Sequence, residues 1–119
     1  MGYYTAYVLN LPAENPLTED GLTQMDEIVD AFQVFEEGSA RDGYWYGYAK
    51  WYDYEQDMAR LSKQFPDILF ELHGNGEDQE DIWYAYFQDG KVQHCQAEIY
   101  FAPFDPKKLT EVPFKDGNG

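Results

Sequence analysis

Between residues 18 and 32 the apolar positions recur every three or four residues, the spacing of one face of an α-helix. This apolar stripe consists of Leu22, Met25, Ile28, Val29 and Phe32. Thr18 precedes the stripe as an N-cap candidate, and Glu19 and Asp20 fall in the first turn, where carboxylates interact favourably with the helix dipole. The pattern therefore predicts a helix whose remaining acidic residues face solvent.

A second helical repeat follows Asp53 and ends at Pro66. Asp53 is the predicted N-cap, and Gln56 lies three residues later, as in a capping box. The inner face of this helix is predicted to consist of Met58, Leu61 and Phe65.

Alternating apolar and polar residues, with many tyrosines, indicate the strands. They are predicted over residues 3–11, 44–52, 68–73, 82–87 and 92–101. Residues 32–37 fit either an extension of the first helix or a short second strand. Asp89-Gly90 separates the last two strands and is a strong signal for a two-residue hairpin turn.

This order of elements predicts an α+β fold. The expected architecture is a ferredoxin-like sandwich, β-α-β-β-α-β plus a C-terminal β-hairpin, with an antiparallel sheet and two helices on one of its faces. Residues 1–110 are expected to form one domain. The chain is irregular from Pro103 onward, and residues 111–119 are expected to be a flexible tail.

The net charge of the chain says more about its function than any single motif does. The 119 residues include 23 acidic and 8 basic ones, for a net charge of −15, and Lys and Arg are absent from residues 1–40 and 64–90. Duplex DNA carries one charge per ~1.7 Å of axis, so this charge equals that of about 25 Å of DNA. A compact chain of this length has a radius of gyration of ~13.5 Å and a diameter of about 35 Å. The charge density is thus of the same order as that of DNA, although solubility alone is an alternative explanation.

Composition also limits the cellular location and the kinds of partner that are expected for this protein. Cys95 is the only cysteine, so an intrachain disulfide is impossible, and no apolar run approaches the ~20 residues of a membrane span. A cytoplasmic protein is expected, including the cytoplasm of an infected host. Free nucleic acid and anionic membranes should be repelled by this charge. The oligomeric state stays open.

Catalytic and metal-binding residue patterns are weak. His94 and Cys95 are adjacent, so on a strand they point to opposite faces and make a poor nucleophilic pair. The acidic loop of residues 74–81 lacks the register of an EF-hand, and a solvated hairpin loop is the preferred interpretation over a calcium site. The chain is therefore expected not to be an enzyme and to need no metal or cofactor.

The strand of residues 44–52 is rich in aromatic residues. Residues 47–51 (GYAKW) faintly resemble the RNP1 pattern with which RNA-recognition motifs stack bases. Tyr46 stands where a basic residue is expected before the glycine, and the overall charge disfavours phosphates. A protein-binding sheet face that includes Tyr46, Tyr48 and Trp83 is the preferred interpretation, because Tyr and Trp are frequent interface anchors.

Four segments resemble small acidic, mostly uncharacterised proteins of bacteriophages and prophages. They are KWYDYEQDM (residues 50–58), FPDILF (65–70), GNGEDQEDIW (74–83) and GKVQ (90–93), and the likeness spans residues 50 to about 105. The resemblance implies a phage or mobile-element origin. Phages commonly encode small acidic proteins that block host defences, anti-CRISPR and anti-restriction proteins among them. No catalytic motif accompanies this pattern.

These observations lead to one functional hypothesis and one alternative. The hypothesis is a phage-encoded inhibitor that mimics DNA and occupies the basic cleft of a host nuclease or other nucleic-acid-binding defence complex. Its acidic contacts are expected to be Glu19, Asp20, Asp26, Glu27, Asp30, Glu36, Glu37, Glu77, Asp78, Glu80 and Asp81. The alternative is an adaptor that binds a protein partner through the aromatic face.

Overall fold

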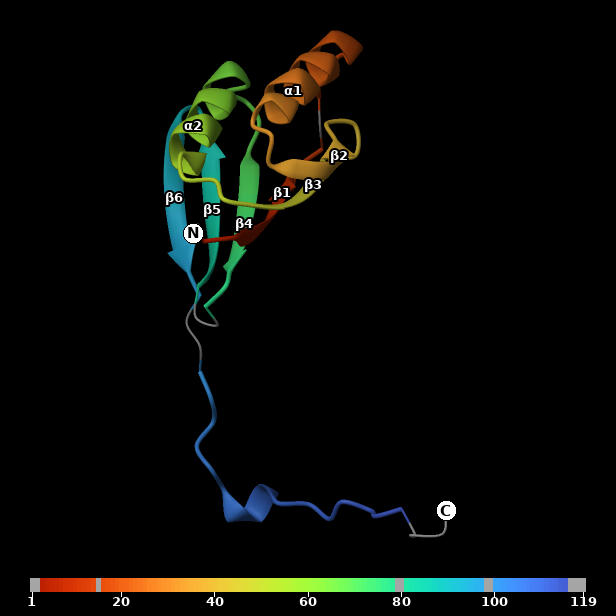
Figure 1. The fold of residues 1–119 in the computed structure, drawn as a ribbon, viewed down its shortest axis with the longest axis vertical. Coiled ribbons are helices and arrows are strands. Elements are labelled where there is room, and N and C mark those ends of the chain that lie inside the picture. The colour runs from red at the N-terminus through yellow and green to blue at the C-terminus, as the bar shows by residue number, and fades with distance from the viewer. Residues whose placement is uncertain (1–2, 15, 79–80, 98–99, 116–119) are drawn as a thin grey trace.

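A computed structural model describes residues 3–14, 16–78, 81–97 and 100–115 (Figure 1). It contains two α-helices, six strands and one short 3₁₀ turn. In chain order they are β1 Thr5–Asn10, α1 Glu19–Ala31, β2 Phe35–Ser39, β3 Tyr44–Ala49, α2 Tyr54–Gln64, β4 Phe70–Gly76, β5 Ile82–Gln88, β6 Lys91–Gln96 and η1 Pro106–Lys108. The predicted α+β order is confirmed, and residues 35–39 adopt the strand alternative.

All six strands form one antiparallel sheet in the order β2-β3-β1-β4-β5-β6. This order does not match the four-stranded ferredoxin-like sandwich, because β5 and β6 extend the sheet beyond β4. The hairpin predicted from Asp89-Gly90 joins β5 to β6, and both turn residues have positive φ, at 50° and 76°. Such left-handed backbone is tolerated best by Gly, Asn and Asp.

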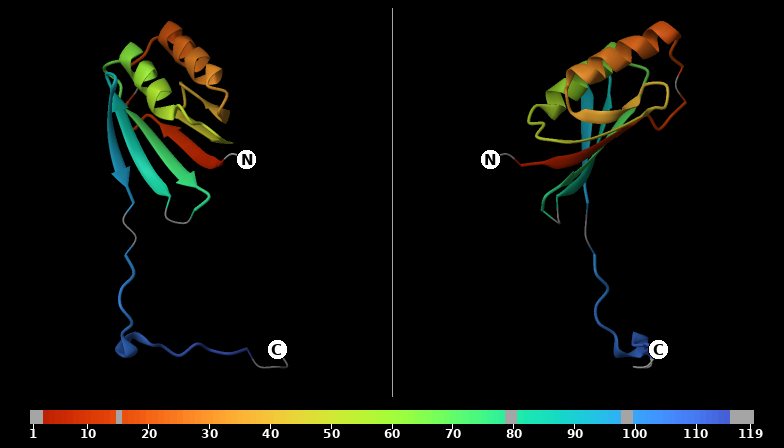
Figure 2. Two further views of the ribbon diagram at one scale, coloured as in Figure 1. Left: turned by 60° about the vertical axis from the view of Figure 1, so that its left-hand side comes forward. Right: turned by 45° about the vertical axis from the view of Figure 1, so that its right-hand side comes forward.

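Both helices cover the same face of the sheet (Figure 2). Every second strand residue points toward the helices, so alternation along the strands creates the core. The helix-covered face contributes core residues such as Leu9, Trp45, Phe70, Leu72 and Phe87, each at most 1% exposed. Met25 and Val29 of α1 and Met58 and Leu61 of α2 close the core from above, as the apolar stripes predicted.

The two helix N-termini differ in their caps. Thr18 accepts a hydrogen bond from the Gly21 N–H at 3.2 Å, which confirms it as the N-cap of α1. Asp53 occupies the cap position of α2, but its side chain makes no capping hydrogen bond. The predicted capping box is therefore wrong, and α2 is held by the packing of its inner face.

Trp51 is the centre of an aromatic cluster at one end of the core. Its ring lies 5.2 Å from Tyr7, 5.3 Å from Phe32, 5.6 Å from Phe35 and 6.2 Å from Tyr54, between ring centroids. The indole Nε1 donates to Asp57 Oδ2 at 2.8 Å, which satisfies its polar atom. Burial raises the pKa of the Tyr7 hydroxyl above its ordinary value, because the phenolate would be poorly solvated in this cluster.

The described residues from Tyr100 onward lie outside the folded domain. Residues 100–115, here called the arm, run away from the sheet in an extended path interrupted only by η1 (Figures 1 and 2). The radius of gyration is consequently 19.9 Å, larger than the compact value expected from length. Sheet pairing ends at Gln96, and the Ala97 N–H still donates to the Ile82 carbonyl at 2.9 Å.

Candidate binding surfaces

The sheet face opposite the helices, here called the open face, is lined by tyrosines. The strand registers place Tyr44, Tyr46 and Tyr48 of β3 and Tyr84 and Tyr86 of β5 on this face. Tyr44, Tyr48 and Tyr84 are 38–49% exposed. The two tyrosine rows lie on either side of β1 and β4, so two strands separate them.

Stacking holds several of these rings in fixed positions. Tyr48 stacks on Tyr4 at 5.1 Å, and the Lys50 ammonium lies 4.9 Å from the centre of the Tyr4 ring. On the other side, Tyr84 stacks on His73 at 4.4 Å. Rings that are already ordered lose little conformational entropy on binding, a property of good interface anchors.

Trp83 does not belong to the open face, contrary to the prediction. It points to the helix-covered side, where its ring stacks on Tyr54 at 4.9 Å and lies 6.2 Å from Tyr7. Its cross-strand partner is Gly74, at which an added Cβ would lie 2.2 Å from the indole ring. The glycine therefore makes room for Trp83 within the aromatic cluster, and its predicted role as an exposed contact is corrected.

A second surface is formed by α1 and the neighbouring edge strand β2, and we call it the acidic edge. Its exposed carboxylates belong to Asp20, Glu27, Asp30, Glu36 and Glu37. Asp20 and Glu27 are two helical turns apart, on the side of α1 away from the buried Met25 and Val29. Glu27 and Asp30 have i,i+3 spacing, which places their Cβ atoms about 5–6 Å apart. Five of the predicted acidic residues thus lie on two adjacent elements, and among them Glu37 pairs with Tyr46 and points to the open face.

Two predicted contact residues of α1 are already engaged within the protein. Asp26 is half-buried, and its Oδ1 accepts the Ala40 N–H at 2.7 Å, so it anchors the β2–β3 turn and does not face solvent freely. Arg41 Nη2 donates to both carboxylate oxygens of Glu19 in an ion pair, and this hydrogen bonding raises the pKa of the Arg41 guanidinium. The expectation that Asp26 belongs to a solvent-facing acidic face is therefore wrong.

Replacing Asp26 with alanine is expected to lower the free energy of unfolding by about 1–2 kcal/mol, because a short hydrogen bond to a charged acceptor is lost. Chemical denaturation would measure this change. Glu27→Ala is the matched control, since Glu27 is the next residue of α1 and exposed. It should change the unfolding free energy by no more than about 0.5 kcal/mol. Equal effects of the two substitutions would contradict the anchoring role of Asp26.

The acidic loop between β4 and β5 lies apart from the acidic edge. It is found at the end of the sheet away from both helices (Figures 1 and 2), and β3 and β1 separate β4 from β2. Glu77 accepts the Tyr4 N–H at 3.1 Å, and the Asp78 N–H donates to the Tyr3 hydroxyl at 2.9 Å. Glu80 lies outside the described residues. The structure therefore does not join residues 77, 78 and 81 to the α1 carboxylates in one patch.

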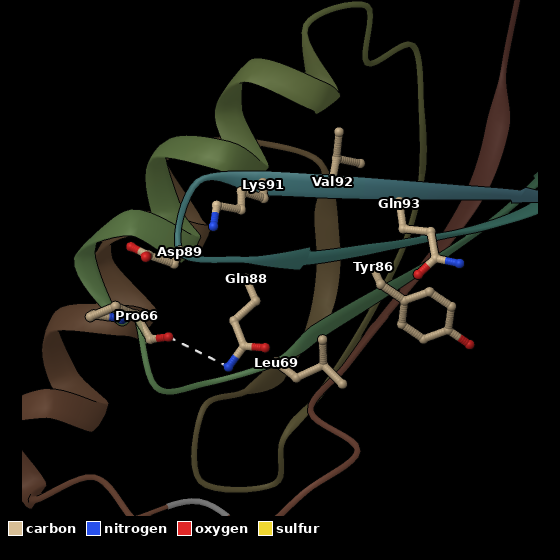
Figure 3. A pocket seen from close by; sticks show the side chains of 8 residues that line it. All are labelled: Pro66, Leu69, Tyr86, Gln88, Asp89, Lys91, Val92 and Gln93. Carbon is tan, nitrogen blue, oxygen red and sulfur yellow. Dashed lines mark hydrogen bonds between the residues drawn. The ribbon is translucent and has the colours of Figure 1, made fainter.

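A shallow pocket of about 470 Å³ lies beside the β5–β6 hairpin (Figure 3). Its walls combine Leu69 and Pro66 with Tyr86 of the open face, and Gln88 Nε2 donates to the Pro66 carbonyl at 3.5 Å. Burial, and then the nearby Glu71 carboxylate, raise the pKa of Tyr86. Asp89 and Lys91 are the charged residues in the lining. An aromatic or proline side chain is the type of group that this wall would accept.

Candidate nucleophilic chemistry is dispersed over the sheet. His73 and Cys95 both face Tyr84 from neighbouring strands, so they are separated by two strand spacings, about 9.5 Å. His94 lies on the opposite face, where its Nε2 is 2.8 Å from Glu55. Among the described residues, no group of three or more His, Cys, Asp or Glu side chains is arranged to hold a metal ion.

Sequence reasoning missed Tyr44, Tyr84 and Tyr86, although strict alternation in residues 82–88 places Tyr84 and Tyr86 together and opposite Trp83.

Within the described part of the chain, no helix has the length and apolar character needed to cross a membrane. Comparison of this chain with protein-family models, with curated protein sequences and with solved structures found no match.

Proposed function

We propose that this protein inhibits a nucleic-acid-binding protein by placing its acidic edge in the basic cleft that normally binds DNA or RNA. The observation that carries this proposal is the set of five exposed carboxylates on the adjacent elements α1 and β2, on a chain with a net charge of −15. Carboxylates presented by a rigid helix and strand offer a basic cleft an alternative to phosphates. Complementary charge of this kind accelerates association and makes it sensitive to salt.

The target class follows from the resemblance of residues 50–105 to small phage and prophage proteins. An acidic inhibitor from such a source would act in the host cytoplasm on a defence nuclease, of the CRISPR or restriction type. The acidic edge would provide charge recognition. Neighbouring aromatic side chains would provide desolvated contacts that select one target among many basic proteins.

Affinity capture from a host lysate tests this proposal. Tagged protein is incubated with lysate and washed at low and at moderate salt, and the bound proteins are identified by mass spectrometry. The proposal expects a nucleic-acid-binding complex that is lost at the higher salt and displaced by added DNA. Recovery only of salt-resistant partners without a nucleic-acid-binding surface would overturn it.

A second candidate function is that of an adaptor, and the ordered tyrosines of the open face favour it. An adaptor would bind its partner through Tyr46 and Tyr48, so Tyr48→Ser would weaken capture of that partner. Charge reversal on α1 and added salt would matter little. The capture experiment separates the two functions through its salt dependence.

The relation to a ferredoxin-like sandwich is likewise a proposal, and it concerns residues 5–76. Within the six-stranded sheet, the first four strands have the neighbours β2-β3-β1-β4 and are joined by both helices. We regard this part as a ferredoxin-like unit to which β5 and β6 were added. The addition widens the open face by the row that contains Tyr84 and Tyr86.

A further inference from the structure

The arm exposes an unusual amount of apolar surface for a segment outside the core. Its six large apolar side chains are 68–93% exposed: Tyr100, Phe101, Phe104, Leu109, Val112 and Phe114. Contiguous exposed apolar side chains typically indicate a surface that is covered by a partner. Figures 1 and 2 show the arm directed away from its own domain.

The arm is partly pre-ordered and poorly suited to pairing with a sheet edge. Pro103, Pro106 and Pro113 have no N–H to donate to a neighbouring strand. Asp105 caps η1 by accepting the Lys107 N–H at 3.0 Å. Prolines and a local turn reduce the conformational entropy that binding would cost. A side-chain surface is therefore a better receptor for the arm than a strand edge.

The arm and the rest of the chain differ in the sign of their net charge. The arm holds three basic and two acidic residues, a net charge of +1. The remaining residues hold five basic and 21 acidic residues, a net charge of −16. Two copies of the domain repel each other, whereas Lys107, Lys108 and Lys115 of an arm would be attracted to a second copy.

The open face provides a receptor of matching character. It combines exposed tyrosines with Glu71, and the pocket of Figure 3 continues it at the β5–β6 edge with Leu69 and Tyr86. Aromatic side chains bury about 150–250 Å² each, so the four of one arm would remove roughly 600–1,000 Å² of their own surface from water. Reciprocal docking of two arms reaches the ~1,200–2,000 Å² of a stable interface.

We propose that two copies of this chain form a dimer by exchanging arms, each arm lying across the open face of the other copy. The contact is reciprocal, so one two-fold axis closes the assembly and leaves neither arm uncovered. Asp20, Glu27 and Asp30 of the acidic edge lie on α1, on the helix-covered side of the sheet, and stay outside this contact, whereas Glu37 pairs with Tyr46 and borders it. The dimer thus leaves the α1 carboxylates free for the inhibitory function proposed above, whereas it covers Tyr46 and Tyr48, the contacts of the adaptor.

Sedimentation equilibrium of the full chain tests the exchange directly. The expected mass is that of two chains. The dimer fraction should rise with salt, because repulsion between two domains of net charge −16 exceeds the attraction that each domain exerts on an arm of net charge +1, and screening weakens both. Phe101→Ser/Phe104→Ser in the arm and Tyr44→Ser/Tyr48→Ser/Tyr84→Ser on the open face should each give monomers. Tyr52→Ser is the matched control, since Tyr52 is 73% exposed and belongs to neither surface.

Mixing the arm variant with the face variant completes the test. The face variant keeps an intact arm and the arm variant keeps an intact open face. A heterodimer joined by this one contact is therefore expected, although each variant alone is monomeric. A full chain that stays monomeric, including one whose arm folds back on its own domain, would overturn the proposal. A dimer that is unaffected by the arm variant would also overturn the proposal. The arm variant does not alter the domain core, and circular dichroism verifies that it is folded.

Discussion

Replacing Trp51 with alanine is expected to lower the free energy of unfolding by about 3–5 kcal/mol, the range for large-to-small substitutions of buried aromatic residues. Trp51 is only 7% exposed and contacts rings from β1, α2 and the α1–β2 connection. A domain of this size is typically stable by about 5–15 kcal/mol, so this loss is a large fraction of the total. The melting temperature should fall by more than about 10 °C.

The adjacent Tyr52 provides the control. It is 73% exposed, so Tyr52→Ala should change the unfolding free energy by no more than about 0.5 kcal/mol. Trp51→Phe retains a ring but removes the Nε1 hydrogen bond to Asp57, and an intermediate loss is expected. Thermal and urea denaturation, both followed by circular dichroism, measure all three. Similar midpoints for Trp51→Ala and Tyr52→Ala would contradict the role of Trp51 as the centre of the aromatic cluster.

Reversing Glu27 and Asp30 to lysine is expected to weaken binding to the captured target about 100-fold or more. Close charge pairs across protein interfaces are worth at least about 1.5 kcal/mol each in double-mutant cycles, and tenfold in Kd corresponds to about 1.4 kcal/mol. Both residues are exposed on α1, so the fold should tolerate the change. Isothermal titration or surface plasmon resonance measures the effect.

The matched control is Glu14→Lys/Asp67→Lys, which reverses two exposed carboxylates outside the acidic edge. Each double variant adds four charges and brings the net charge from −15 to −11. Nonspecific attraction should weaken equally in both, and only the α1 variant should lose the specific contacts. Equal loss of affinity would show that net charge, and not the acidic edge, determines binding.

Local signals in the sequence predicted much of the fold. The helical stripe that contains Met25 and Val29, the Thr18 cap and the Asp89-Gly90 hairpin all depend on neighbours within a few residues, and the structure confirms them. The full strand order depends on long-range pairing. The sequence contains no local signal that β5 and β6 add to the β4 side of the sheet.

Predictions about the binding surfaces were wrong where contacts between distant parts of the chain determine which way a side chain points. Asp26 was expected to be a solvent-facing contact because it lies off the apolar stripe, but the β2–β3 turn folds back and uses it as an acceptor. Trp83 was expected beside Tyr46 because both are aromatic. Its strand neighbours Ala85 and Phe87 are buried under the helices, and the period of two along a strand places Trp83 with them.

If the acidic edge occupies the nucleic-acid-binding cleft of its target, DNA and this protein cannot bind the target together, and a competition titration measures this exclusion. Labelled DNA bound to the captured target is titrated with this protein, and fluorescence anisotropy reports the bound DNA. Complete displacement of the DNA is expected at saturation. The apparent affinity of the target for this protein should fall as the DNA concentration rises. A stable ternary complex of target, DNA and this protein would contradict it.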